Sequence, residues 1–374
     1  MNGKIRGVNL GNWLVIEKWM SEALFSGTDA MDETWLCTRL GPEKARERLK
    51  VHRDEFITER DFEEIAAMRF NAVRIPVPYF LFEDIGPFIH CYEYLDKAFD
   101  WAEKYGLKIL VDLHSAPGGH NGTDNSGVCG ICTWSAKQEN VDDTVSVLEK
   151  IAERYGRREA MWGIEVLNEP MCSDTEAGKL LNIQNLVEFY IPVDKELAKQ
   201  NTNYSLAFLR QFYRDAYTAI RRHMEPDRYV VFSDAFEREI WDDFLKEFEG
   251  VVLDTHNYLM TADMGVFREK NIQVYTDYLR ELGKNVNSTA RRIPLIVGEW
   301  NAQNQADGLA EMTNAERDSL YCKISEEFQK GMEDTMGWFY WSWKIHGTGG
   351  IDDVVDDACR CVQHGYLRVN GRSI

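Results

Sequence analysis

Eight short segments rich in β-branched and aromatic residues recur along this chain of 374 residues. In order they are IRGVNLG (5–11), AVRIPV (72–77), KILVDLH (108–114), WGIEVLN (162–168), YVVFSD (229–234), VVLDTHNY (251–258), IPLIVGEW (293–300) and GWFYWSW (337–343). Nearly continuous apolar strands that alternate with amphipathic helices are typical of a parallel sheet covered on both faces. Eight such units predict the α/β class and a (β/α)8 TIM barrel, formed by residues 1–374 as a single domain.

Helical periodicity separates most of these segments, as in residues 58–70, 92–106 and 205–224. A barrel of this kind usually takes about 250 residues, which leaves roughly 120 residues for enlarged loops after the strands. The longest candidates are residues 12–57 and 170–204.

The charge balance limits the classes of partner that the protein can bind. Lys and Arg number 43 against 62 Asp and Glu, which gives a net charge of −19. Such a surface repels polyphosphates and disfavours anionic polysaccharides, so we expect no nucleic-acid partner and a neutral substrate.

No apolar run approaches the roughly 20 residues that span a bilayer, so we expect no membrane partner. The N-terminal sequence MNGKIRGVNLGNWLVIEKW lacks the apolar stretch and cleavage site of a signal peptide. A cytoplasmic location is therefore expected if Met1 is the native start, and a secreted one if a leader was removed.

Eight cysteines are scattered along the chain without the spacing of a disulfide framework, which is typical of reduced thiols. Cys129 and Cys132 form a C-x-x-C pair, and Cys359 and Cys361 a C-x-C pair. A zinc site built from these four is the weaker alternative, because the second spacing does not match a standard knuckle. We expect no metal and no cofactor.

Polar and aromatic residues collect at the C-terminal ends of the predicted strands. They are Arg74, His114, Asn168, Glu169, His256, Tyr258, Glu299, Trp341 and Trp343. Active sites of (β/α)8 barrels lie at this mouth, so we expect these side chains to share one cleft.

Two of these residues, Glu169 and Glu299, follow the fourth and seventh strands. A glycosidic bond is broken by a pair of carboxyl groups, one that protonates the leaving oxygen and one that attacks or activates water. A strand-end glutamate in an ion pair with Arg74 is the structural alternative. The asparagine before Glu169, the tryptophan after Glu299 and the rim histidines favour a catalytic pair.

The motifs RIP (74–76), DLH (112–114), LNEP (167–170), HNY (256–258), GEW (298–300) and YWSWK (340–344) occur in barrel order over nearly the whole chain. With them the sequence resembles glycoside hydrolase family 5, whose members are retaining β-glycosidases on (β/α)8 barrels. IRGVNLGNWLVIEKWM (5–20) and DLHSAPGGHNGTDNSG (112–127) are similar to its exo-β-1,3-glucanase branch.

The resemblance implies that Glu169 is the general acid/base and Glu299 the nucleophile. It implies that Asn168 binds the sugar 2-hydroxyl, that Arg74 lies beneath Glu299 and that Tyr258 contacts Glu299. Because a proton donor needs a raised pKa and a nucleophile a low one, the surroundings of the two glutamates are expected to differ.

The same resemblance implies that His114 and His256 line the floor of the sugar site. It implies that Trp343, with Trp341 near it, offers a flat apolar face to the sugar ring.

At the far end of that site, the resemblance implies that Glu17 and Asp124 bind the hydroxyls of a terminal glucose and block a longer chain. Trp19 stands where tyrosine is more usual in the branch. Thr123 and Thr261 stand where its fungal-type members place phenylalanines at the cleft entrance, so the leaving-group side is expected to differ.

These observations predict a retaining β-glycosidase that acts on a neutral β-glucan or β-glucoside, as an exo-acting glucan β-1,3-glucosidase that releases glucose. An endo-β-1,4-glucanase of the same family is the alternative, and a cleft open beyond Glu17 and Asp124 would favour it. An inactive carbohydrate-binding barrel is disfavoured, because binding alone requires neither an acid nor a nucleophile.

Overall fold

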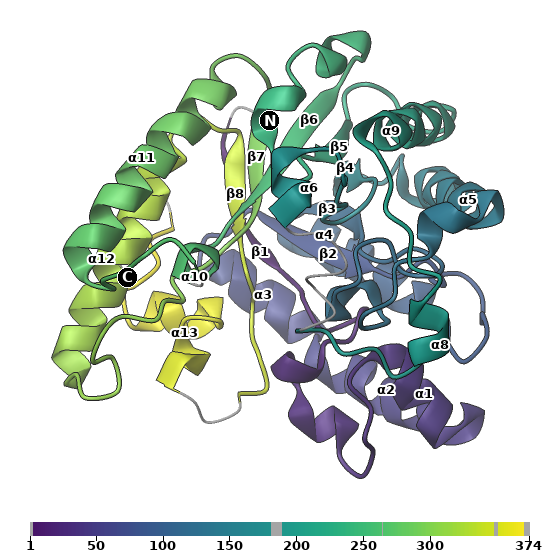
Figure 1. Ribbon diagram of the computed structural model, residues 1–374, viewed down its shortest axis with the longest axis horizontal. Coiled ribbons are helices and arrows are strands. Elements are labelled where there is room, and N and C mark those ends of the chain that lie inside the picture. Colours follow the sequence, from purple (N-terminus) through teal and green to yellow (C-terminus); the bar gives the residue numbers. More distant parts are fainter. Residues whose placement is uncertain (1–2, 181–188, 264, 348–350, 370–374) are drawn as a thin grey trace.

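The computed structural model describes residues 3–180, 189–263, 265–347 and 351–369. Eight parallel strands close into a barrel in chain order, with β8 paired to β1, which confirms the predicted (β/α)8 fold (Figure 1). The strands are β1 Ile5–Asn9, β2 Ala72–Val77, β3 Lys108–Leu113, β4 Met161–Glu165, β5 Tyr229–Ser233, β6 Val251–Asn257, β7 Leu295–Trp300 and β8 Gly337–Tyr340.

The closing contact between β8 and β1 depends on Gly337. Its backbone has φ 142°, and a Cβ atom there would lie 2.1 Å from the backbone oxygen of Ile5. A side chain at this position would separate the two strands, so only glycine allows the seam to form.

The barrel interior is built in layers because side chains alternate along each strand. The lowest apolar layer takes one residue from every strand, namely Ile5, Ala72, Leu110, Trp162, Val231, Val252, Ile296 and Phe339. Two residues further along β2, β3 and β6, the next layer holds Arg74, Asp112 and Asp254, all fully buried. The barrel therefore carries charged groups directly beneath its mouth.

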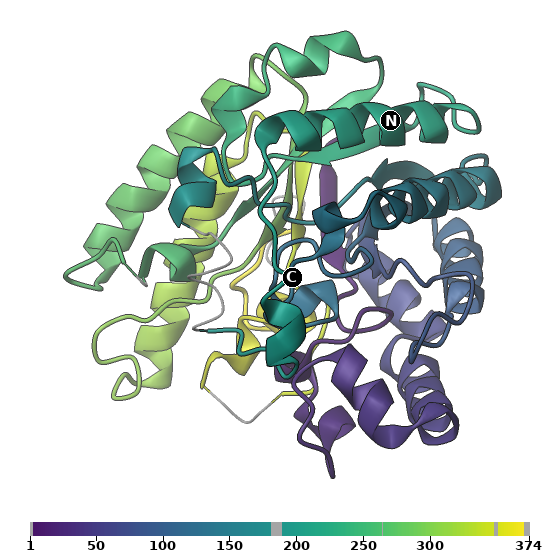
Figure 2. The same cartoon turned by 45° about the vertical axis from the view of Figure 1, so that its right-hand side comes forward.

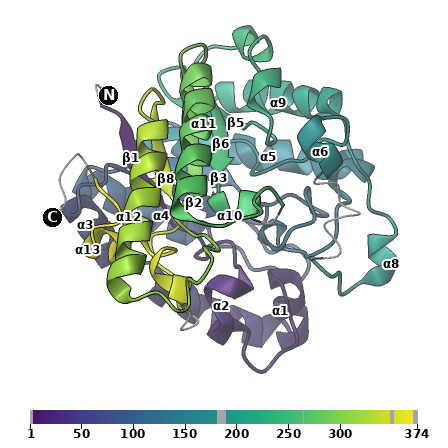
Figure 3. The ribbon, with the colours of Figure 1, turned by 60° about the vertical axis from the view of Figure 1, so that its left-hand side comes forward.

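Amphipathic helices cover the outside of the barrel. They are α3 Glu59–Ala67, α4 Tyr92–Tyr105, α5 Gln138–Tyr155, α9 Leu206–Arg221, α11 Ile272–Ala290 and α12 Asn314–Gly331, with the short helices α10 Leu259–Asp263 and α13 Ala358–Gln363. Figure 3 shows α11 and α12 side by side on one flank. Gly283 and Gly331 permit this approach, because a Cβ atom on Gly283 would lie 2.5 Å from the Cα of Gly331. No helix in the described part of the chain is both long enough and apolar enough to cross a membrane.

Both enlarged loops occur where the sequence predicts them. Residues 12–57 contain η1 Lys18–Met20, η2 Glu22–Phe25, α1 Glu33–Leu40 and α2 Pro42–Phe56, and they share a small core of their own. Figures 1 and 2 show α1 and α2 projecting beside the barrel, in purple. The described part of residues 170–204 contains α6 Glu176–Leu180 and α8 Lys195–Ala198.

Candidate active site

Arg74 on β2 is the centre of the buried polar layer. Its guanidinium donates to Glu299 Oε1 at 2.7 Å, to Glu165 Oε2 at 2.8 Å and to Asn168 Oδ1 at 2.9 Å. It also lies 3.1 Å from Asp112 Oδ2. Burial disfavours its charge, but Asp112, Glu165 and Glu299 hold the pKa of Arg74 well above its usual value. Because a guanidinium has five N–H donors in one plane, Arg74 fixes the positions of these acceptor side chains together.

Glu299 on β7 receives a second hydrogen bond at its other oxygen. The hydroxyl of Tyr258, just beyond β6, donates to Glu299 Oε2 at 2.7 Å. Burial first, and then the charge of Glu299, raise the pKa of Tyr258 well above its usual value, so the phenol keeps its proton. Glu299 is thus held between Arg74 and Tyr258, as the resemblance implies.

Glu169 lies four residues beyond the end of β4, with a backbone φ of 46° that side chains rarely adopt. Its Oε1 lies 2.7 Å from His256 Nδ1, and its Oε2 accepts a bond from Asn125 at 3.3 Å. His256 Nδ1 is also 3.5 Å from Glu299 Oε2. One imidazole therefore faces both carboxylates.

The two glutamates stand close together at the mouth. One carboxylate oxygen from each, together with a nitrogen of His256, all lie within 4.8 Å of one another. Carboxyl groups about 5–5.5 Å apart suit a covalent glycosyl-enzyme, whereas about 6.5–9.5 Å is needed to place a water between them. The spacing fits the double-displacement geometry.

The free site does not give Glu169 the raised pKa expected of a proton donor. Burial raises its pKa, but the hydrogen bond and charge of His256, with His114 and Arg74, outweigh burial and lower it. The pKa of His256 shifts in the opposite direction. Burial lowers its pKa, yet Glu299, Asp254 and Glu169 raise it well above its usual value. The two shifts therefore favour a proton on His256 over a proton on Glu169.

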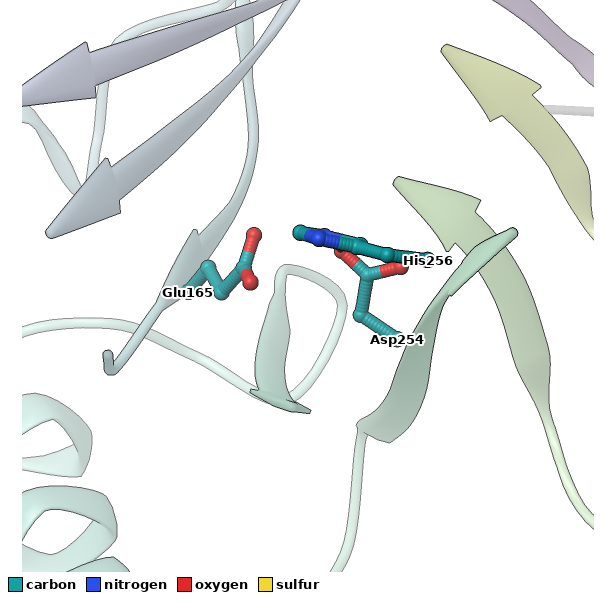
Figure 4. A group of neighbouring side chains, drawn as sticks. All are labelled: Glu165, Asp254 and His256. Atoms are coloured by element: carbon teal, nitrogen blue, oxygen red, sulfur yellow. Dashed lines mark ion pairs between the residues drawn. The ribbon is translucent and has the colours of Figure 1, made fainter. Parts of the chain in front are cut away.

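Beneath the pair lies a second group, formed by Glu165 of β4 and by Asp254 and His256 of β6 (Figure 4). His256 Nε2 is 3.6 Å from Asp254 Oδ2, and Asp254 Oδ1 accepts the backbone N–H of Gly298 at 2.5 Å. In Figure 4 the carboxyl groups of Glu165 and Asp254 point toward the imidazole ring.

The cysteines form no metal site within the described residues. All eight are free thiols, and the two groups there that could hold an ion, Glu165–Asp254–His256 and Glu169–His256–Glu299, contain none of them. The thiols of Cys129, Cys132 and Cys361 face backbone carbonyls instead. The zinc alternative is therefore wrong for these side chains.

Glu17 and Asp124 converge on the same cleft. Burial first, and then the charge of Asp124, raise the pKa of Glu17 well above its usual value, and burial also raises the pKa of Asp124. Trp19 donates its indole N–H to Glu17 Oε2 at 2.8 Å. The cleft encloses about 200 Å³ and is lined by Glu17, Trp19, His114, Asp124, Asn125, Glu169, Tyr190, Tyr258, Met260, Thr261, Glu299, Asn301, Gln303 and Trp341.

The two tryptophans after β8 have different surroundings. Trp341 lines the cleft and stacks on His114 with ring centroids 5.9 Å apart. Trp343 is only 1% exposed, packs against Phe70 and donates its N–H to Asp61 Oδ1 at 3.0 Å. The expectation that Trp343 faces the sugar is wrong, because Asp61 of α3 holds its indole on the outer side of the barrel.

Several lining residues are absent from the sequence prediction, namely Asn125, Tyr190, Met260, Asn301 and Gln303. Met260 lies in the short helix α10, Asn125 lies in the 3-10 turn Asp124–Ser126, and the other three lie in loops. These segments are too short or irregular to show a period, so only closeness to Asp124, Tyr258 or Glu299 in the sequence could have indicated some of them. Thr261 lines the cleft, but Thr123 is buried and bonded to Asn121 and Asn125, so it does not stand at the entrance.

Comparison with known proteins gives concordant relatives. The family model "Cellulase (glycosyl hydrolase family 5)" matches residues 45–347. Probable glucan 1,3-beta-glucosidase A of Aspergillus fumigatus is 32% identical over 390 aligned positions, covering 94% of this chain and 85% of the relative. Glucan 1,3-beta-glucosidase of Kluyveromyces lactis is 32% identical, with 93% and 85% covered. The crystal structure of rutinosidase from Aspergillus niger shares the fold at TM-score 0.76 and 22% identity, with 98% of each chain covered. The chain belongs to glycoside hydrolase family 5.

Proposed function

We propose that this glycoside hydrolase is a retaining, exo-acting glucan β-1,3-glucosidase that releases glucose from non-reducing ends. The observation that carries the proposal is the pair Glu169 and Glu299, whose carboxylate oxygens lie within 4.8 Å of each other in a cleft bordered by Glu17 and Asp124. The β-1,3 linkage is proposed because the relatives in Aspergillus fumigatus and Kluyveromyces lactis are named as glucan 1,3-beta-glucosidases.

In the first step Glu299 attacks the anomeric carbon and the bond to the leaving oxygen breaks. As the new bond consumes the charge of Glu299, His256 loses an anion that stabilises its proton. The proton then passes from His256 Nδ1 to Glu169 and from Glu169 to the leaving oxygen. In the second step Glu169 takes a proton from water, whose oxygen attacks the anomeric carbon and releases Glu299. Glu169 then passes this proton to His256 Nδ1, which restores the starting state.

Two buried polar atoms without partners support binding of a sugar at this place. Asn168 accepts from Arg74 through Oδ1, while its Nδ2 has no partner among the described residues. His114 faces Asp112 through Nδ1, and its Nε2 is likewise unpaired within that part of the chain. Buried polar atoms are normally hydrogen-bonded, so a ligand hydroxyl at each would complete the site. Asn168 suits the 2-hydroxyl, whose bond strengthens in the transition state.

Exo action is proposed from the carboxyl groups at the far side of the cleft. Glu17 and Asp124 would accept hydrogen bonds from the O4 and O6 hydroxyls of a terminal glucose. A substituted sugar would leave both groups desolvated and unpaired, which is why such a site rejects an extended chain.

Product analysis on laminari-oligosaccharides tests this function. Wild type should release glucose alone, and a first appearance of internal fragments would establish the endo alternative. Glu17→Ala should lower kcat/KM on short glucosides about 10- to 100-fold, because a bond to a charged group contributes about 1.5–3 kcal/mol. Glu22→Ala, at an exposed position on η2, is the matched control.

A further inference from the structure

Three buried polar atoms without hydrogen-bond partners face one another beneath the active site. They are Glu165 Oε1, Asp254 Oδ2 and His256 Nε2, and none of them has a hydrogen-bond partner within the described residues, although Nε2 and Oδ2 form an ion pair at 3.6 Å. One ligand atom from each of these side chains lies within 4.8 Å of the other two (Figure 4). Glu165 and Asp254 are fully buried, so bulk water does not solvate these atoms.

The other atoms of the two carboxyl groups are already bonded. Glu165 Oε2 accepts from Arg74 at 2.8 Å, and Asp254 Oδ1 accepts from the backbone of Gly298 at 2.5 Å. Asp254 Oδ2 is also packed against β7, since a Cβ atom on Gly298 would lie 1.8 Å from it. His256 Nε2 lies 3.6 Å from Asp254 Oδ2, but no donor reaches Glu165 Oε1 among the described residues. An ionised Glu165 has only acceptors, so it would leave this buried oxygen unsatisfied beside Asp254.

We propose that Glu165 is a neutral acid whose Oε1 carries a proton and donates it toward Asp254 Oδ2, directly or through one water. Asp254 Oδ2 in turn faces Nε2 of His256 at 3.6 Å, and His256 directs Nδ1–H at Glu169. Glu165 is therefore a positioning residue, which acts on the acid/base pair through Asp254 and His256. The inference rests on the proposed function only where it concerns that pair.

The charges around the group agree with this assignment. Burial raises the pKa of Glu165 well above its usual value, and the charge of Arg74 does not offset burial together with Asp112 and Asp254. The charged and titratable groups that act on Glu165 or His256 are Arg74, Asp112, Glu169, Tyr213, Asp234, Asp254 and Glu299. Arg74 is the one permanent cation among them, so a neutral Glu165 reduces the buried excess of negative charge.

Infrared difference spectroscopy of the whole protein in D₂O at pH 8 tests the proton directly. A protonated carboxyl absorbs at a frequency separate from a carboxylate, so Glu165→Gln should remove one carboxylic-acid band. The amide keeps a donor toward Asp254 and an acceptor for Arg74, so the midpoint of thermal unfolding should stay close to that of wild type. An unchanged carboxylic-acid region, with a large fall in the midpoint, would show that Glu165 is ionised and overturn the proposal.

The pH profile of kcat/KM separates positioning from packing. Asp254→Asn removes an anion that stabilises the proton of His256, so the alkaline limb should move about one unit or more to lower pH. Glu165→Gln should leave that limb in place, and an equal shift in both variants would contradict the neutral acid. One equivalent of a tightly held divalent metal in purified wild type would likewise overturn it. The infrared band is read without substrate, so inactivity on glucans would refute the proposed function and leave this test intact.

Discussion

His256 Nδ1 lies 2.7 Å from Glu169 Oε1, so the side chains of these two residues share one hydrogen bond. The resemblance to the family implies separate roles for these two residues, Glu169 as the acid/base and His256 as part of the floor of the sugar site. The contact makes them one titrating unit whose protons belong to the pair.

Replacement of His256 should therefore change stability in a pH-dependent way. The folded-state pKa of His256 is raised, so its contribution is complete below about pH 6.5 and is lost as pH rises through the folded-state pKa. The lowered pKa of Glu169 adds stability that is complete above about pH 4.3 and is lost as pH falls through its folded-state pKa. In thermal unfolding from pH 3 to 9, the unfolding midpoint of wild type should exceed that of His256→Gln by the largest amount between about pH 4.3 and 6.5. A constant difference would contradict this, and His364→Gln, at an exposed histidine, is the control.

The two glutamates should differ in their response to azide. Glu169→Ala keeps the nucleophile, so it should still cleave dinitrophenyl β-glucoside, accumulate glycosyl-enzyme and yield β-glucosyl azide. Glu299→Gln lacks the nucleophile, so it should turn over very slowly and form no such product. Chromatography with mass detection measures the azide adduct, and rescue of Glu299→Gln to the same product would reverse the two roles.

Arg74→Met should destabilise the fold strongly. Removal of one member of a buried ionic cluster leaves unpaired charge and costs about 3–5 kcal/mol in the free energy of unfolding. Arg60→Met, at an exposed pair with Glu64, should cost less than about 1 kcal/mol. Denaturant unfolding measures both, and equal losses would show that the buried network contributes little.

Trp343→Phe should affect stability more than catalysis. The change removes the N–H that Asp61 accepts and leaves space in a fully buried site, which should cost about 1–3 kcal/mol. Because Trp341 and not Trp343 lines the cleft, kcat/KM on p-nitrophenyl β-glucoside should stay near wild type. A loss of kcat/KM without a fall in the unfolding midpoint would instead place Trp343 against the sugar.

The barrel could be predicted from the sequence because each strand is buried on both faces and therefore appears as an apolar segment. The positions of Glu169 and Glu299 follow from the ends of those segments. Arg74, expected at a strand end, lies instead within β2 in the buried layer beneath the mouth. Both Trp341 and Trp343 lie beyond the end of β8 at Tyr340, so the strand pattern does not determine which of them faces the cleft. The bond from Trp343 to Asp61 decides it, and that contact is not visible in the sequence.

Side-chain partners and loop positions are not contained in that pattern. In the sequence Glu165 is indistinguishable from an ordinary strand residue. Its place under His256 depends on the direction in which the Glu165 side chain points into the barrel. The pKa of Glu169 depends on its 2.7 Å contact with His256, which lies 87 positions away in the sequence. Tyr190 reaches the cleft from a long loop whose path no periodicity specifies.

Arg74 also donates to Asn9 Oδ1 at 3.0 Å, and Asn9 Nδ2 donates to the backbone oxygen of Gly298 at 2.9 Å. The cluster thus joins β1 to β7 across 289 sequence positions. Contacts of such long range form only after the intervening chain has been ordered, and they slow folding. We therefore expect catalytic competence to appear late in the folding of this enzyme. Partly folded chains, whatever secondary structure they have gained, lack an aligned pair of carboxylates, so we expect them not to hydrolyse substrate.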